Sequence, residues 1–179
     1  MSGNKIALRY AKALFKVANA NNILTDVMDN MILLKSTMDE QKDLVQALKN
    51  PVVKASQKEQ ILLQSFKSFN PTVLDFMSLI VNKNRAEYMG EITAQFMELF
   101  NEQNLIVTAE VSSATALTDK EEREVIALLE KRTGAKQINL TKNIKSDLIG
   151  GLVIQYGDSL LDSSVLSRIN TLKKELQIA

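Results

Sequence analysis

Ser159 lies in one of the few short segments of this chain whose residue types could support chemistry. It occupies the third position of a Gly-Asp-Ser-Leu sequence that begins at Gly157, a nucleophile motif found in some lipases. A serine nucleophile needs a base to accept its proton, and enzymes with this motif use histidine. Because the 179 residues include no histidine, we interpret Gly157 and Asp158 as a hairpin turn.

Two further segments could bind an ion. A phosphate loop requires glycines that bring several backbone N–H groups to a helix N-terminus, whereas Gly150 and Gly151 precede strand-type residues. The pair therefore predicts a bulge or a close backbone contact. Asp158 and Asp162 could coordinate a cation, but calcium takes roughly six to eight oxygens and no loop of that kind is present. We expect no catalytic residue, no metal and no cofactor.

Composition narrows the function classes further. Cysteine, histidine and tryptophan are absent, which excludes disulfides, zinc sites built from Cys and His, and histidine-based triads. Any catalysis at neutral pH would need a perturbed carboxylate or lysine. The 22 basic residues nearly balance the 21 acidic ones, whereas proteins that bind duplex nucleic acid usually carry a strong basic excess.

Residue patterns divide the chain near residue 104. Eight of the nine aromatic residues precede that point, and four of the six glycines follow it. Apolar residues recur with helical spacing throughout the first part, and the Asn50-Pro51 and Asn70-Pro71 pairs interrupt that pattern. We therefore expect a bundle of six helices over about 6–17, 24–38, 44–48, 56–66, 73–81 and 84–100.

Beyond residue 104 the apolar spacing changes from helical to alternating. Strands are expected from Leu105 to Val111, around Ile138 and over 152–156, with a short return after Gly157. Thr118 and Glu121 form a capping box for a helix that Gly134 ends, and a last helix begins at Asp162 or Ser163. The fold class is therefore mostly α, a six-helix bundle followed by a small β-α-β-β-α module. The two domains span 1–104 and 105–179.

The first helix carries an apolar stripe beside a basic row. The stripe consists of Ile6, Tyr10, Ala13 and Val17, and the row of Lys5, Arg9, Lys12 and Lys16. The row has three interpretations: a solvated face, the basic edge of a groove for an acidic amphipathic helix, or a membrane-surface helix. On the fifth helix Phe76, Leu79, Ile80 and Lys83 are most simply core. These patterns favour a binding protein.

Several motifs, in register from residue 9 to 172, resemble the delta subunit of bacterial and chloroplast F-type ATP synthases. That subunit is the counterpart of the mitochondrial oligomycin-sensitivity-conferring protein. The matching segments are Arg9-Tyr10-Ala11-Lys12-Ala13-Leu14-Phe15, Asn50-Pro51 with Lys58, Asn84-Arg85, Ile149-Gly150-Gly151-Leu152-Val153-Ile154, Gly157-Asp158, and Asp162-Ser163-Ser164-Val165 with Arg168, Ile169 and Leu172.

The resemblance implies a non-catalytic stator subunit, present once per complex, without metal or cofactor. Its helical domain would bind the N-terminal helices of the alpha subunits, and its C-terminal module the C-terminal ends of the b subunits. The subunit would lie at the cytoplasmic face of the bacterial inner membrane. It would neither insert into the membrane nor bind nucleic acid. By position, Tyr10, Ala13 and Leu79 would line the groove for an alpha helix.

Helical spacing extends that groove to Ile6, Phe76 and Lys83. Val165, Ile169 and Leu172 either contact the stalk or belong to the core, and the sequence leaves both open. The alternatives from other classes are a free-standing helical adaptor unrelated to the synthase, an enzyme with a perturbed carboxylate or lysine, and a nucleic-acid binder.

Overall fold

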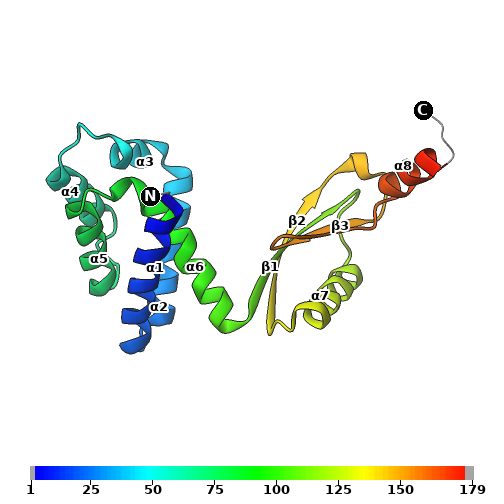
Figure 1. The fold of residues 1–179 in the computed structure, drawn as a ribbon, viewed down its shortest axis with the longest axis horizontal. Coiled ribbons are helices and arrows are strands. Elements are labelled where there is room, and N and C mark those ends of the chain that lie inside the picture. The colour runs from blue at the N-terminus through cyan, green and yellow to red at the C-terminus, as the bar shows by residue number, and fades with distance from the viewer. Residues whose placement is uncertain (1–2, 176–179) are drawn as a thin grey trace. The chain divides into compact units, whose positions relative to one another are not determined.

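The computed structural model describes residues 3–175, which divide between Phe100 and Asn101 into two compact units. The N-terminal unit is helical, and its helices surround one apolar core (Figure 1). In chain order they are α1 (Gly3–Ala20), α2 (Leu24–Glu40), α3 (Lys42–Lys49), α4 (Ala55–Ser65), α5 (Pro71–Asn82), the 3₁₀ turn η1 (Ala86–Tyr88) and α6 (Met89–Asn104). The sixth helix thus begins a few residues later than expected, after a 3₁₀ turn.

Helix α1 packs on the core through its smallest side chains. Ala7, Ala11, Leu14 and Ala18 are buried at helical spacing, and next to this stripe Phe15 packs against Phe96 of α6 with tilted rings and ring centroids 5.7 Å apart. The buried stripe therefore lies one residue beyond the Ile6–Val17 stripe that the sequence emphasised. Three of the four buried residues are alanines, which let the α1 backbone approach its neighbours closely, and the residues of the Ile6–Val17 stripe lie on the flank.

Helix α5 begins as the Asn70-Pro71 pair predicts. The Asn70 side chain accepts a hydrogen bond from the Thr72 N–H at 3.0 Å, and Pro71 occupies the first helical position. The Asn70 N–H in turn donates to the Asn30 side chain of α2 at 2.7 Å. This link fixes the start of α5 against α2.

The C-terminal unit contains a mixed sheet of four strands. Its elements are β1 (Ile106–Ser113), α7 (Asp119–Thr133), β2 (Gln137–Ile144), the 3₁₀ turn η2 (Ser146–Leu148), β3 (Leu152–Tyr156), β4 (Ser159–Asp162) and α8 (Val165–Glu175). The strand order is β2-β1-β3-β4, with β1 parallel to β2 and the other pairs antiparallel. The core of this unit consists of Ala109, Val111, Val125, Leu129 and Ile154.

The β-α-β-β-α pattern expected for this unit was one strand short. The return after Gly157 pairs with β3 over Ser159–Asp162 and is a full edge strand, so the order of elements is β-α-β-β-β-α. Ile154 of β3 lies opposite Leu161, which packs against the core from the edge. The apolar and polar residues of this strand alternate only weakly over four positions. The sequence pattern therefore did not distinguish the strand from a continuation of the turn.

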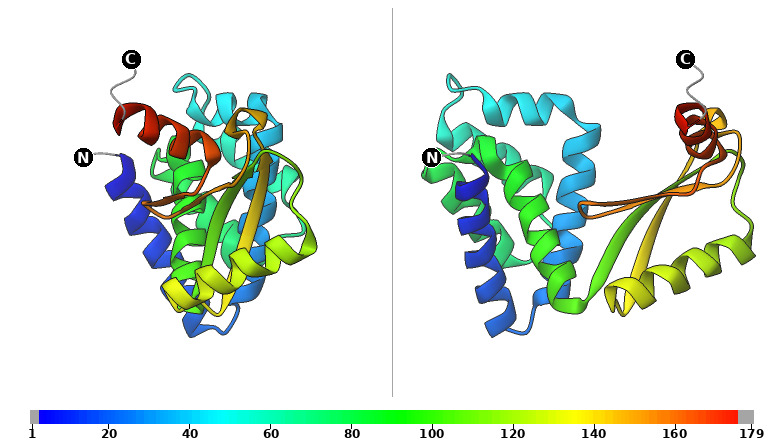
Figure 2. Two further views of the ribbon diagram at one scale, coloured as in Figure 1. Left: turned by 90° about the vertical axis from the view of Figure 1, so that its right-hand side faces the viewer. Right: turned by 45° about the vertical axis from the view of Figure 1, so that its right-hand side comes forward.

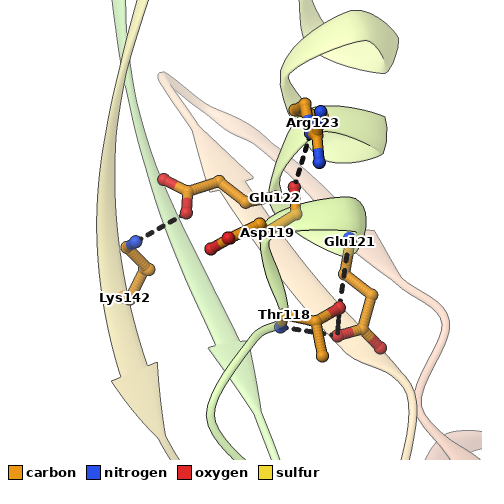
Figure 3. A network of polar contacts seen from close by, with 6 residues as sticks. All are labelled: Thr118, Asp119, Glu121, Glu122, Arg123 and Lys142. Carbon is orange, nitrogen blue, oxygen red and sulfur yellow. Dashed lines mark hydrogen bonds and ion pairs between the residues drawn. The ribbon is translucent and has the colours of Figure 1, made fainter.

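Helix α7 covers one face of the sheet, as Figures 1 and 2 show. Its capping box is present: the Thr118 hydroxyl accepts from the Glu121 N–H at 3.3 Å, and the Glu121 carboxylate accepts from the Thr118 N–H at 2.8 Å (Figure 3). Glu122 pairs with Lys142 of β2 at 2.8 Å, which joins the helix to the sheet. At the other end Gly134 adopts a left-handed conformation, as expected.

The Gly150-Gly151 pair makes the close backbone contact that the sequence predicts. Gly151 has a φ of +77°, and a β-carbon there would lie 2.3 Å from the Ser163 carbonyl oxygen. The Gly150 carbonyl accepts from the Val165 N–H at 2.9 Å. The two glycines therefore allow the first residues of α8 to lie directly on the chain that enters β3.

We predict that Gly151→Ala destabilises the chain by about 3 kcal/mol or more, because both the backbone conformation and the contact with Ser163 oppose a side chain. Gly157→Ala is the matched control, since its φ of +52° is also positive but no atom lies within 4 Å of its β-carbon position. The control should lose only about 1 kcal/mol. Urea unfolding followed by circular dichroism measures both, and equal losses would contradict the close contact.

Candidate partner-binding surfaces

The flank of α1 leaves apolar side chains at the surface. Ile6 and Tyr10 are half-buried, and Ala13 and Val17 are exposed. Tyr10 packs partly on the core, whereas Val17 retains 46% exposure. Val17 was part of the stripe in the sequence but not of the predicted site, and it extends this flank toward the end of the helix.

Helix α5 presents a second apolar flank. Its buried residues are Val73, Met77, Ile80 and Val81, so of the residues expected to be core only Ile80 is fully buried. Phe76 is half-buried against the core, while Leu79 is 47% exposed and Lys83 is exposed. The predicted site residues thus form two flanks on helices that share one core. Whether the two flanks make a single groove stays a prediction.

The basic row of α1 is also at the surface. Lys5, Arg9, Lys12 and Lys16 are exposed, and the ion pairs among the described residues involve other lysines. A carboxylate from outside could therefore pair with them without displacing an internal partner.

Helix α8 carries the third set of predicted residues. Val165 and Leu172 are exposed, the latter by 55%, and Ile169 is half-buried. Among the described residues, the core of the C-terminal unit draws on β1, β2, β3, β4, α7 and Leu117 but on no residue of α8. The structure therefore favours a surface role for this stripe over a core role.

Polar contacts fix the first turn of α8. The Asp162 carboxylate accepts from the Ser164 N–H at 2.8 Å, and the buried Ser164 hydroxyl accepts from the Ser167 N–H at 3.1 Å. The hydrogen bonds from Ser164 hold the pKa of the exposed Asp162 carboxyl below its ordinary value. Ser163 also binds the Leu152 carbonyl through both its N–H and its hydroxyl, at 2.9 Å each.

A separate hollow lies on the N-terminal unit and has no part in the predicted site. It measures about 640 Å³ and lies between α2, α3 and the start of α6, with Met38, Val45 and Gly90 among its apolar lining. Lys42 and Lys49 of α3 border it, as do Glu87 and Glu91. This mixture of charges specifies no ligand class.

No described residue group has three or more acidic side chains arranged to hold a metal ion. Among the helices within residues 3–175, none has the length and apolar character needed to cross a bilayer.

Each of the two units exposes apolar side chains next to cationic ones. This combination is typical of proteins that bind other proteins. Residues 6–176 match the model of the ATP synthase delta (OSCP) subunit family. The chain is 34% identical over 169 residues to the ATP synthase subunit delta of Pelodictyon phaeoclathratiforme, covering 94% of both chains. It is 30% identical over 176 residues to the ATP synthase subunit delta of Bacillus subtilis, covering 98% of this chain and 97% of the relative.

The fold has a solved counterpart. A chain of the Toxoplasma gondii mitochondrial ATP synthase hexamer superposes with a TM-score of 0.75 over 97% of this chain and 98% of its own length, at 20% identity. The chain belongs to the ATP synthase delta (OSCP) subunit family, and it is a non-catalytic stator component of the F-type ATP synthase. Membership of this family rules out the three alternative interpretations of the sequence, namely a free-standing adaptor, an enzyme and a nucleic-acid binder.

We predict a pH dependence for the start of α8. A carboxyl whose pKa is lowered by folding stabilises the fold above its unfolded value, and that stability is lost as the pH falls through the folded value. Asp162→Asn, which keeps the shape, should therefore lower the melting temperature at pH 7 and at pH 5 by similar amounts. Below the ordinary aspartate pKa of 3.8 the difference from the native chain should shrink. A constant difference down to pH 2 would contradict this role of the charge.

Proposed function

We propose that the N-terminal unit binds the N-terminal helices of the alpha subunits and that the C-terminal unit binds the C-terminal ends of the b subunits. One observation carries this division: each unit has its own core and leaves a separate apolar stripe outside it. The site on the head would consist of Ile6, Tyr10, Ala13, Phe76, Leu79 and Lys83, and the stalk contact of Val165, Ile169 and Leu172.

The chemistry of the α1 and α5 flanks suits a stator. A subunit that holds the catalytic head against rotor torque needs an interface that dissociates slowly. Buried apolar and aromatic anchors supply slow dissociation better than exposed ion pairs do. Tyr10, Phe76 and Leu79 would be these anchors, and the basic row of α1 would steer an acidic amphipathic helix into place.

As a subunit of a membrane-associated synthase, the chain would act peripherally. We place it on the cytoplasmic face of the bacterial inner membrane, in one copy per complex. Isolation of the intact synthase from the organism, followed by quantitative mass spectrometry, would test the copy number.

We predict that Ala13→Asp weakens binding to a synthetic peptide with the sequence of the alpha-subunit N-terminus by about a hundredfold or more. The cause would be a carboxylate that the apolar face of the peptide would have to desolvate. Ala13 is exposed in the free chain, so the melting temperature should move by less than about 2 °C. Calorimetric titration of the full chain measures the affinity.

The matched control is Asn19→Asp, which adds the same charge at an exposed position on another side of α1. It should leave the affinity within about twofold. Equal affinities of native chain and Ala13→Asp would exclude the α1 flank as the binding site.

We predict that Leu172→Asp weakens binding to the soluble part of the b subunit by about tenfold or more, because an apolar anchor is lost and a carboxylate takes its place. The control is the neighbouring exposed Thr171, changed to Asp, with little expected effect because helical spacing turns it away from the apolar stripe. Surface plasmon resonance with immobilised b subunit measures both. If Thr171→Asp is as harmful as Leu172→Asp, the stripe does not form the contact.

A further inference from the structure

Ile149 has a backbone conformation that its side chain disfavours. Its φ is +63° and its ψ −38°, a combination outside the left-handed helical region and rare for β-branched residues. Such conformations cost on the order of 1–3 kcal/mol and persist where the surrounding structure or the function requires them. A glycine would adopt this backbone conformation readily. The next two residues, Gly150 and Gly151, are glycines, but position 149 is not.

The core of the C-terminal unit does not account for the isoleucine. Its side chain is 63% exposed, and it is not among the residues that pack on the core of the C-terminal unit. Ile149 therefore presents apolar surface to the outside from a strained backbone. Selection for stability alone would favour glycine at this position.

The position of Ile149 connects it to the stripe on α8. Gly150 follows it directly, binds the Val165 N–H through its carbonyl, and has the Val165 side chain 3.2 Å from its β-carbon position. Figures 1 and 2 both show α8 beside the segment that follows β2, and α8 contacts η2. Three of the large apolar side chains exposed on this unit lie in these segments: Ile149, Val165 and Leu172.

The charges in the same segments are mostly positive. Arg168, Lys173 and Lys174 of α8 and Lys145 before η2 are exposed, and none takes part in an ion pair with another side chain of residues 3–174. The acids in or next to these segments are Asp147, Asp162 and Glu175, and Asp162 is engaged at the start of α8. The surface thus has apolar side chains within a basic surrounding.

We propose that Ile149 is a specificity-determining residue of the C-terminal unit, which with the α8 stripe binds an amphipathic helix whose apolar face is flanked by acidic side chains. This inference rests on the proposed function and names a residue and a partner chemistry within it. The strained backbone keeps an exposed apolar side chain directly after η2, the turn that contacts α8, where it contributes to binding instead of folding.

The test measures binding of the soluble part of the b subunit to the full chain and to Ile149→Gly. The variant loses the apolar side chain without losing a core contact, so the affinity should fall about tenfold or more. Its melting temperature should be unchanged or higher, because relief of the backbone strain offsets the greater freedom of glycine in the unfolded chain. A fall of several degrees would make Ile149 a folding residue and overturn the proposal.

Leu105→Gly is the matched control. Leu105 has a φ of +54° and is 48% exposed, but it precedes β1 and is not part of the segments around α8. It should leave the affinity within about twofold, whereas an equal loss would assign the effect to backbone flexibility and overturn the proposal. Unchanged affinity of Ile149→Gly would do the same. If the native chain itself does not bind the b subunit, the proposed function fails first.

The partner chemistry has its own variant. Arg168→Glu combined with Lys173→Glu, at the two exposed cations that flank the α8 stripe, should weaken binding by about fivefold or more and reduce its salt dependence, because two attractive contacts become repulsive. Unchanged or tighter binding would exclude an acidic partner helix while leaving the role of Ile149 to its own test.

Discussion

The close approach of backbones at small residues governs both units of this protein. Ala7, Ala11 and Ala18 bring α1 onto the helical core, and Gly150 and Gly151 bring the start of α8 onto the chain entering β3. In each place small residues occupy the closest contact, while apolar side chains such as Val17 and Leu172 remain exposed beside it. The core of each unit therefore forms without these exposed side chains.

This arrangement suits a component that transmits force without catalysis. Each unit has a core of its own, so occupation of its exposed stripe is not required for folding. The polar contacts around Thr118 and Asp162 hold the first turns of α7 and α8 through charged groups that accept backbone N–H bonds. Rigid elements of this kind present a surface that does not have to be ordered during binding, which lowers the entropic cost of association.

Local chemistry made much of the fold predictable. The Asn70-Pro71 start of α5, the Thr118–Glu121 capping box and the left-handed Gly134 follow from neighbouring residues, and all are present. The predictions failed where distant contacts decide. Four residues after Gly157 become a strand only because β3 lies beside them, and the α1 stripe moves by one residue because packing favours small side chains over bulky ones.

The sequence by itself determined the change from helices to a mixed α/β module, the absence of histidine and cysteine chemistry, and the motifs that mark the family. These depend on residue types and short spacings. Only the tertiary structure decided that the α8 stripe is outside the core, that Leu79 is exposed, and that Ile149 has a positive φ. The exposure of a side chain and the strain of its backbone depend on which distant segments pack together. The spacing of residues along the sequence does not specify those long-range contacts.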